Sequence, residues 1–541
     1  MRLRLALLLL LFSLTSASPG AANPDIWSVL APGIDFQLFH LTHPRPVNLF
    51  VARLDRGELS ATVDSAIAQG QLTSGRETIS AMAARYNQTI NYWGENWGNR
   101  SRVVVTVNGY YFNLGSGRPL SGQVQSGWYA QRFSEYVGDT GFAWTLYRDA
   151  FIGKCVFHTP RDQFLTVLRS GETRKIDALN LPRGMDELIL YTPQYTAATG
   201  TNNNGVEVLV EMARPTLVLP EPAMARGRVV KIRDLHGNTS IPFDHVVLSA
   251  TGTSREGLLS RLQTGDEIGI SQEVDNCSGS PQNDWTKTYA AIGGDYHFLT
   301  GGALTIDGSN PDEGVPNSRT AVGYSPNYIY FIVADGWNRN VSEGISIGEL
   351  GAFARDTLGA TDAVTLDSGG SSTMVINGQV ANNTYCNFTR QCGMAPESGP
   401  SQTSFPDRDL NPRSRNLPSR TDGPPAAPDL EPLVGNALMM VSVEPKVQSE
   451  ALVSGQAVTT RQAAELRLGP GTNYAVLANI AVGVEGAVLG MHYNDLNGVL
   501  ATGSYWQQVE FGSQYGWMRQ DTLVWAPPEG LPAWFLPLIR R

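Results

Sequence analysis

Long hydrophobic runs are nearly absent from this 541-residue chain, and basic residues are in deficit. The apolar run at residues 5–14 is too short to span a bilayer, so we expect no transmembrane anchor. Lys and Arg number 40 against 50 Asp and Glu, which gives a formal net charge of −10. Nucleic acids and anionic membranes bind to basic surfaces. The charge therefore argues against either of them as the main partner.

Charged residues are also few, at 17%, whereas hydrophobic residues make up 42% of the chain. Both values are typical of a folded, soluble protein and not of a disordered one. The length favours two or three domains with a large core.

The first residues have the pattern of a signal peptide. Arg2 and Arg4 precede the apolar run, and small residues at 15–17 or 20–22 offer a cleavage site. We therefore predict a signal peptide over residues 1–22 and a secreted or extracytoplasmic, cell-envelope location.

Cysteine is scarce, and the four residues match no metal-site spacing. An even number in an exported chain allows two disulfides. Cys386 and Cys392 are close enough to close a small loop, and a pairing of Cys155 with Cys277 stays open. We predict no cofactor, and the sequence leaves a bound divalent cation open. In a eukaryotic host, glycosylation acceptors would be Asn87, Asn99, Asn238, Asn276, Asn340, Asn382 and Asn387.

Proline marks the clearest break in the chain. Residues 396–432 are rich in proline and polar residues, and such a segment cannot bury enough apolar surface to fold alone. The strand-like run that follows, residues 433–443, indicates that the break is a loop or insertion within one domain. We therefore predict a large domain over 23–445, a linker at 446–457, a second domain over 458–526 and a tail at 527–541.

The second predicted domain contains short strand-sized runs separated by Gly and Pro turns, which favours a small all-β barrel. The stretch "LRLGPGTNYAVL", followed by Trp506 and Gly516-Trp517, resembles the bacterial SH3-like domains of envelope proteins. That resemblance implies binding of a cell-wall polymer or packing against a partner domain.

Two helices are indicated in the large domain by capping signals. Ser74 with Glu77 precedes apolar residues at helical spacing, and Ser346 with Glu349 does the same. Gly359 would end the second helix. Because strand-like runs flank that helix, we predict an α/β or α+β mixed-sheet catalytic domain with helices, followed by the small barrel.

Two carboxylates stand just past strand-like runs. Asp335 follows residues 328–334, and Asp367 follows residues 363–366. A strand–helix–strand unit makes its two strands parallel, and parallel strands end at the same edge of a sheet. We therefore expect both carboxylates on one rim. Asn108 follows a third strand in the same way, although the sequence does not fix which strand lies beside it in the sheet. The alternative is that each Asp is only a turn or helix-cap residue.

The turn after Asp367 is rich in small residues that expose backbone N–H groups, which favours an anion-binding nest. Arg319, in a polar turn before a strand, suits bidentate binding of phosphate, although such an arginine is more often solvated. Asp295 and His297 lie in a further Gly-rich segment, and His297 is more often a structural group in such a setting. The residues of the turn are Gly369, Gly370, Ser371 and Ser372.

With these residues in place, the chain resembles the phosphodiester glycosidase family over roughly residues 76–443. The segments that carry the resemblance, in order, are "VNGYYFN", "SRTAVGYS", "ADGW", "TLDSGGSSTMVING" and "VGNAL". The resemblance implies an active-site cleft that includes Asn108, Arg319, Asp335, Asp367, Gly370, Ser371 and Ser372. From these and the neighbouring residues we predict catalysis by Asp367, Asp335 and Arg319, and substrate binding by Asn108, Asp295, Gly369, Gly370, Ser371 and Ser372. The resemblance also implies hydrolysis of a sugar-1-phosphodiester, with Asp367 as nucleophile or base, Asp335 as second choice for that role, and a phosphate-linked glycan as partner.

The family's turn has glycine where this chain has Ser368, which adds local strain if that position needs a positive φ. The Gly-rich segment also continues differently here, with Asp295. These departures favour an alternative, a carbohydrate- or cell-wall-binding envelope protein with a degenerate site. A partner-binding or protease-inhibitor function is a third hypothesis.

Overall fold

The structure is a computed structural model that describes residues 27–526 with internal gaps. The gaps are residues 73, 94–95, 135–138, 158–162, 213–224, 273, 277–287, 307, 309–310, 387–430, 445–451, 473, 490–497 and 502. The predicted signal peptide, almost all of the Pro-rich segment, the first half of the linker and the tail therefore lie outside the described residues. Cys277 and Cys392 do so too. Neither described cysteine is a free thiol, and the pairing of the four cysteines stays a prediction.

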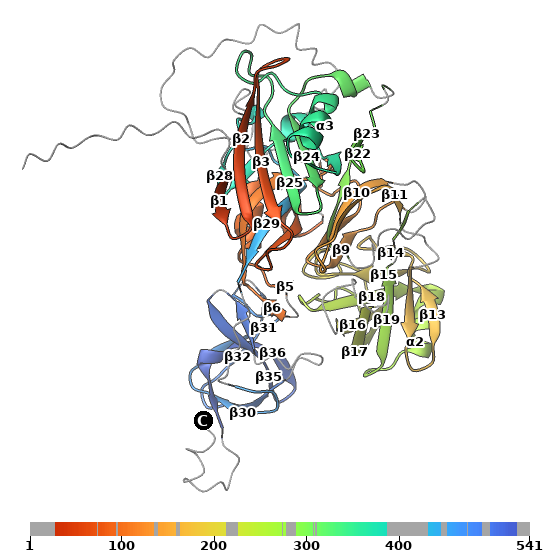
Figure 1. The fold of residues 1–541 in the computed structure, drawn as a ribbon. Coiled ribbons are helices and arrows are strands. Elements are labelled where there is room, and N and C mark those ends of the chain that lie inside the picture. The colour runs from red at the N-terminus through yellow and green to blue at the C-terminus, as the bar shows by residue number, and fades with distance from the viewer. Residues whose placement is uncertain are drawn as a thin grey trace, which may run out of the picture.

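The predicted fold class is wrong, because the protein is built mainly of β-sheets (Figure 1). Strands account for 50% of the structure and helices for 10%. The described residues contain three α-helices, α1 (Ile79–Tyr86), α2 (Gly252–Arg261) and α3 (Ile347–Asp356). The prediction extended one strand–helix–strand unit to a whole domain. Most neighbouring strands are instead paired antiparallel, and this pairing needs no helical crossover.

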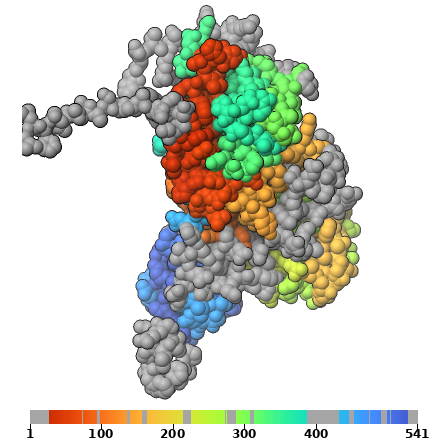
Figure 2. Space-filling view, viewed as in Figure 1, coloured from red at the N-terminus to blue at the C-terminus, as the bar shows by residue number. Residues whose placement is uncertain are grey.

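Two sheets form the body that holds the predicted site residues. The first sheet has the order β1 (Ser28–Ala31), β2 (Ile34–Leu41), β3 (Val47–Asp55), β25 (Tyr328–Ala334), β24 (Arg319–Tyr324), β26 (Asp362–Thr365), β22 (His297–Thr300) and β23 (Ala303–Leu304). The second has the order β28 (Gln379–Val380), β27 (Met374–Ile376), β7 (Ser101–Asn108), β29 (Asn436–Val443) and β4 (Ala61–Ile67). Strand β29 therefore returns to this body after the Pro-rich segment. In the space-filling view the N-terminal strands, in red, lie directly beside the green and teal segment that carries β24–β26 and α3 (Figure 2).

Two further sheets are inserted between β7 and β22. The third sheet has the order β20 (Asp275–Asn276), β11 (Ala150–Phe157), β10 (Asp139–Thr145), β21 (Thr288–Gly294), β8 (Gln123–Gln125) and β9 (Trp128–Gln131). The fourth has the order β13 (Glu172–Lys175), β12 (Gln163–Val167), β19 (Glu267–Gln272), β17 (Ala225–Asp234), β16 (Gly205–Met212), β18 (His245–Thr251), β15 (Leu188–Tyr191) and β14 (Ala178–Leu179). A small hairpin is formed by β5 (Asn91–Trp93) and β6 (Asn96–Gly98).

The C-terminal residues form one antiparallel sheet, as the turn pattern indicates. Its order is β32 (Val476–Ile480), β31 (Ala464–Arg467), β36 (Gln514–Arg519), β35 (Ser504–Phe511), β33 (Glu485–Val488), β30 (Ala457–Thr460) and β37 (Leu523–Trp525), with β34 (Val499–Ala501) paired to β35. The hydrogen-bonded order does not close on itself, so the expected SH3-like barrel is not shown. The sheet shares an apolar cluster with the fourth sheet, where the rings of Trp517 and Phe243 lie 5.6 Å apart.

The cores explain why the first two sheets face each other. One buried cluster joins Phe331 of the first sheet, Val105 of the second and Phe142 of the third. Helix α3 covers the other face of the first sheet with Leu350 and Phe353. Helix α1 covers the other face of the second sheet. Residues at the ends of β7, β24 and β26 therefore meet near the boundary between the two facing sheets.

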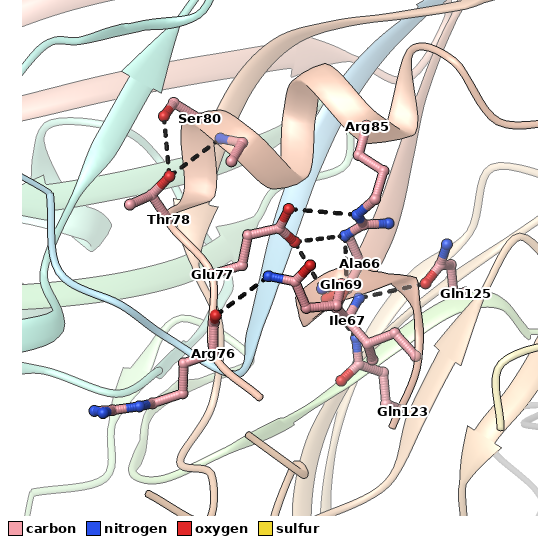
Figure 3. Close-up of polar contacts among 11 residues, drawn as sticks. Ala66, Ile67, Gln69, Arg76, Glu77, Thr78, Ser80, Arg85, Gln123 and Gln125 are labelled. Atoms are coloured by element: carbon pink, nitrogen blue, oxygen red, sulfur yellow. Dashed lines mark hydrogen bonds and ion pairs between the residues drawn. The ribbon is translucent and has the colours of Figure 1, made fainter. Parts of the chain in front are cut away.

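The predicted cap of α1 is wrong, whereas that of α3 is confirmed. Helix α1 begins after Thr78, whose hydroxyl accepts a hydrogen bond from the backbone N–H of Ala81. Glu77 does not cap the helix, because its carboxylate binds the Arg85 guanidinium and the backbone N–H of Gln69 (Figure 3). In α3, Ser346 and Glu349 form the reciprocal capping box.

Candidate active site

The ends of three strands bring the two predicted carboxylates to one edge of the first sheet. Strands β25 and β26 run in the same direction, and β24 lies between them, antiparallel to both. Asp335 is the residue after β25, and Asp367 lies two residues after β26. Both adjoin the beginning of β24, where Arg319 is the first residue. The strand–helix–strand reasoning thus predicts the shared rim, although it missed the intervening strand.

Asp367 is held at this rim from both sides. Its backbone N–H donates to the carbonyl of Gly109 at 3.0 Å. Its carboxylate Oδ2 accepts a hydrogen bond from the hydroxyl of Ser371 at 2.6 Å. The Asp367 side chain is largely buried. A carboxylate fixed in this way costs little reorganisation when it acts on a reacting atom.

Asn108, the last residue of β7, fixes the backbone of Asp367. Its side-chain amide donates to the Asp367 carbonyl at 2.6 Å. Its side-chain oxygen accepts from the Thr320 hydroxyl at 2.7 Å and from the Thr373 backbone N–H at 3.1 Å. These three hydrogen bonds join β7, β24 and the glycine turn. The Asn108 side chain that makes them has 0% exposure, so water cannot replace them. The sequence did not fix the neighbours of Asn108, and its predicted function in substrate binding stays a prediction.

The glycine–serine turn does not need a positive φ at Ser368, which was the condition for strain at this position. Ser368 has a φ of −110°, an ordinary extended value, and the positive φ of +73° falls on Gly369. Serine at position 368 therefore adds no backbone strain. The backbone N–H of Gly369 donates a hydrogen bond to the Ser318 carbonyl at 2.9 Å. Gly369, Gly370 and Ser371 form one 3-10 turn, and the N–H of Gly370, the second residue of that turn, has no backbone acceptor among the described residues.

Asp335 is more deeply buried than Asp367 and accepts its hydrogen bonds from one segment. The side-chain amide of Asn382 donates to its Oδ1 at 3.0 Å, and the Asn383 backbone N–H donates to both carboxylate oxygens at 3.1 and 3.2 Å. Burial raises the pKa of Asp335 to about 6, and these hydrogen bonds only partly oppose it. A carboxyl group with this pKa exchanges a proton close to neutral pH.

Asn382 is a site residue that the sequence reasoning missed. The amide that binds Asp335 also donates to the Ser372 carbonyl at 3.2 Å, so one side chain connects Asp335 to the glycine–serine turn. Its side-chain oxygen accepts from the Met374 backbone N–H at 2.7 Å. The side chain is buried and fully used, which does not suit a glycan acceptor. The Asn-X-Thr pattern was the only signal at this position, and it indicated a different property.

Arg319 and Asp295 lie at the same rim in different settings. The guanidinium of Arg319 is buried and donates to the carbonyls of Ile345 at 3.4 Å and Val315 at 3.0 Å. Asp295 is exposed, and its backbone N–H donates at 2.8 Å to the carbonyl of Thr365, two residues before Asp367. His297 instead contacts Thr300 at 3.2 Å, in agreement with a structural function.

Two buried polar groups near the rim have no partner in the described part of the chain. Ser372 is buried, and its Oγ makes no hydrogen bond there. The side-chain nitrogen and oxygen of the fully buried Asn436 also make no hydrogen bond to the described residues. Asn436 begins β29, and a Cβ on Gly109 would collide with its side chain. The segment "VGNAL" carries part of the family resemblance, but nothing in the sequence points to Asn436 itself.

The described residues contain no group of three or more His, Cys, Asp or Glu that could hold a metal ion. None of their helices has the length and apolar character needed to cross a membrane. The candidate site comprises two carboxylates, an arginine and a small-residue turn, a set suited to anionic and hydroxyl-bearing ligands.

A comparison with protein-family models finds a match over part of the chain. Residues 225–395 match the model of the phosphodiester glycosidase family. This range includes Asp295, Arg319, Asp335 and the segment from Asp367 to Ser372. A search of curated proteins finds no match.

Among solved structures, a hypothetical protein of Synechocystis aligns with 15% identity and a TM-score of 0.46. The alignment covers 76% of this chain and 62% of that protein, less than two thirds of its length. A protein of Burkholderia pseudomallei described as exported aligns with 20% identity and a TM-score of 0.43, over 73% of this chain and 74% of that one. The catalytic domain of zebrafish N-acetylglucosamine-1-phosphodiester alpha-N-acetylglucosaminidase, auto-inhibited by its pro-peptide, aligns with 13% identity and a TM-score of 0.35, over 77% and 85%.

Proposed function

We propose that this protein is an exported hydrolase that cleaves the glycosidic bond of a sugar-1-phosphodiester. The substrate would be a phosphate-linked glycan or envelope polymer. The observation that carries the proposal is the position of Asp367, held by Asn108 and Ser371 beside a small-residue turn, within the range that matches the family. A carboxylate at the edge of an anion-accepting turn can act at the sugar carbon while the phosphate is bound next to it.

In the proposed reaction the bond between the anomeric carbon and the phosphate oxygen breaks. The leaving group is a phosphate monoester, which is already a stable anion and needs less proton donation than an ordinary sugar alkoxide. Asp367 supplies the negative charge against the oxocarbenium-like centre, as nucleophile or as base for water. The sugar leaves with the hydroxyl from water, and the phosphate monoester leaves as the second product.

The other site residues have supporting functions in this proposal. The N–H group of Gly370 and the buried hydroxyl of Ser372 are suited to bind phosphate oxygens. Arg319 donates to two backbone carbonyls, which orient its guanidinium, and in this proposal its positive charge attracts the phosphate. Asp335 is the second carboxylate, and a pKa of about 6 allows it to exchange a proton near neutral pH.

The test is Asp367→Asn, which removes the charge and keeps the size. Turnover of a synthetic sugar-1-phosphodiester should fall at least about 1,000-fold, the equivalent of about 4 kcal/mol of transition-state stabilisation. KM should change little, because the lost interaction forms mainly in the transition state. Asp356→Asn is the matched control, since Asp356 is exposed on α3 and pairs with Arg355.

A reaction in water labelled with oxygen-18 distinguishes the bond that breaks. Cleavage of the glycosidic bond places the label in the sugar, whereas cleavage at phosphorus places it in the phosphate. Label in the phosphate, or near-normal turnover by a folded Asp367→Asn protein, would contradict the proposal.

A further inference from the structure

Trp337, two residues after Asp335, has an unusual backbone conformation. Its φ is +59°, in the left-handed region that bulky side chains rarely adopt. The conformation is imposed by a tight loop, in which Asn338 and Ser342 pair through two backbone hydrogen bonds of 2.9 and 2.8 Å. The Ser342 hydroxyl also donates to the Asp335 carbonyl at 2.9 Å. Strain of this kind persists where a side chain has a function in one position.

The ring of Trp337 forms a corner with the ring of Tyr385. Their centroids lie 4.4 Å apart, and the ring planes meet at 71°. Both side chains are only partly buried. The two rings therefore present two apolar surfaces that meet at a steep angle, and part of each ring is exposed to solvent.

This corner adjoins the turn that follows Asp367. A Cβ on Gly369 would lie 3.9 Å from Cη2 of Trp337, and a Cβ on Gly370 would lie 3.6 Å from Cδ1 of Tyr385. The two glycines thus bring the rings against the turn backbone. The aromatic corner and the proposed anion-binding turn share one location.

The two rings come from distant parts of the sequence, and hydrogen bonds to Asp335 connect the two segments that carry them. Its carboxylate accepts hydrogen bonds from Asn382 and Asn383, which fixes the segment ending in Tyr385. Its own position in the chain fixes Trp337 two residues later. One buried carboxylate therefore holds both rings in register.

We propose that Trp337 and Tyr385 form the subsite that binds the sugar ring of the substrate. A pyranose ring has a face of C–H groups and a rim of hydroxyls. The partly exposed rings provide apolar surface for the C–H face, while Asp367 and the turn lie where the polar rim and the phosphate would be. This inference rests on the proposed function and deepens it, because it names what holds the sugar in the same site.

The test exploits the backbone strain of Trp337. Asn and Gly adopt a positive φ more easily than Trp, so Trp337→Asn and Trp337→Gly remove the ring without disturbing the loop. Calorimetric titrations would use glucose 1-phosphate, N-acetylglucosamine 1-phosphate and inorganic phosphate. We expect affinity for the aldose 1-phosphate that the unmodified protein binds best to fall at least about tenfold. Affinity for inorganic phosphate should stay unchanged.

Two controls separate binding from structure. Tyr385→Phe keeps the ring and should retain sugar binding, whereas Tyr385→Ala should weaken it. Tyr147→Ala removes a tyrosine that is 58% exposed and far from the site in the sequence, and it should change nothing. The unfolding temperature of Trp337→Gly should not fall, because the loop loses strain.

The outcomes distinguish this inference from the proposed function. Unchanged sugar binding in both Trp337 variants, or weaker binding only together with a lower unfolding temperature, overturns the sugar subsite. Sugar binding that depends on Trp337 in a protein that does not hydrolyse sugar-1-phosphodiesters supports the subsite and overturns the proposed function.

Discussion

The hydrogen bonds of Asn108 offer the sharpest stability test of the site. Replacing Asn108 with Ala deletes the amide that joins β7, β24 and the glycine turn. The Thr373 N–H, the Thr320 hydroxyl and the Asp367 carbonyl each lose a partner in a region with no solvent exposure at Asn108 itself. An unsatisfied buried group costs about 1–3 kcal/mol. Since the Thr320 hydroxyl can rotate, we expect a total loss of about 3–5 kcal/mol.

Two matched substitutions show whether hydrogen bonding is the cause. Thr320→Val removes a buried hydroxyl that donates to Asn108, and we expect it to destabilise by about 1 kcal/mol. Thr106→Val removes a buried hydroxyl of β7 that has no hydrogen-bond partner within the described residues. That change should be neutral or stabilise by up to about 1 kcal/mol, because an unpaired hydroxyl no longer needs to be desolvated.

The assay is urea unfolding of the full chain, with hydrogen exchange of a peptide covering residues 366–374. The Thr373 amide should lose protection in Asn108→Ala and keep it in Thr106→Val. A loss below about 1 kcal/mol for Asn108→Ala, or equal effects of the two Thr→Val changes, would refute the reasoning.

Two further predictions concern buried groups of the protein. Burial raises the pKa of Asp335 and of Asp64 to about 6 each, so between pH 4 and 6 the folded state binds these protons more tightly than the unfolded state. Each contribution to stability is therefore fully present below the ordinary value of 3.8 and is lost as the pH rises through 6. The stability of the unmodified protein relative to Asp335→Asn should fall by about 2 kcal/mol between pH 4 and 7 in urea titrations; a constant difference would contradict the pKa assignment. Trp517→Ala removes a buried ring that packs on Phe243, and it should lower the free energy of unfolding by about 3–5 kcal/mol. Hydrogen-exchange protection should fall in the fourth sheet as well as in the C-terminal sheet. A loss of protection confined to the C-terminal sheet would show that the two sheets unfold independently.

Local features of the site were predictable because they depend on neighbours in the sequence. The capping box of α3 needs only residues three apart, and it is present. The order strand–helix–strand gave β25 and β26 the same direction, which placed Asp335 and Asp367 at one edge. The cap of α1 shows the limit of such patterns. Glu77 has the right spacing from Ser74, but Arg85 and the Gln69 backbone, eight residues away on either side, take its carboxylate.

The tertiary structure alone decided the fold class and the second half of the site. Sequence order does not reveal that β24 lies between β25 and β26, or that two more sheets are inserted between β7 and β22, since antiparallel pairing can join strands at any separation along the chain. Asn108 meets Thr320 across more than 200 residues, and Asn382 meets Asp335 across 47. The sequence by itself determined which residue types were available for the chemistry. Which of them face a ligand and which hold the others in place depends on contacts between distant segments, because a buried side chain takes its function from the partners that folding brings to it.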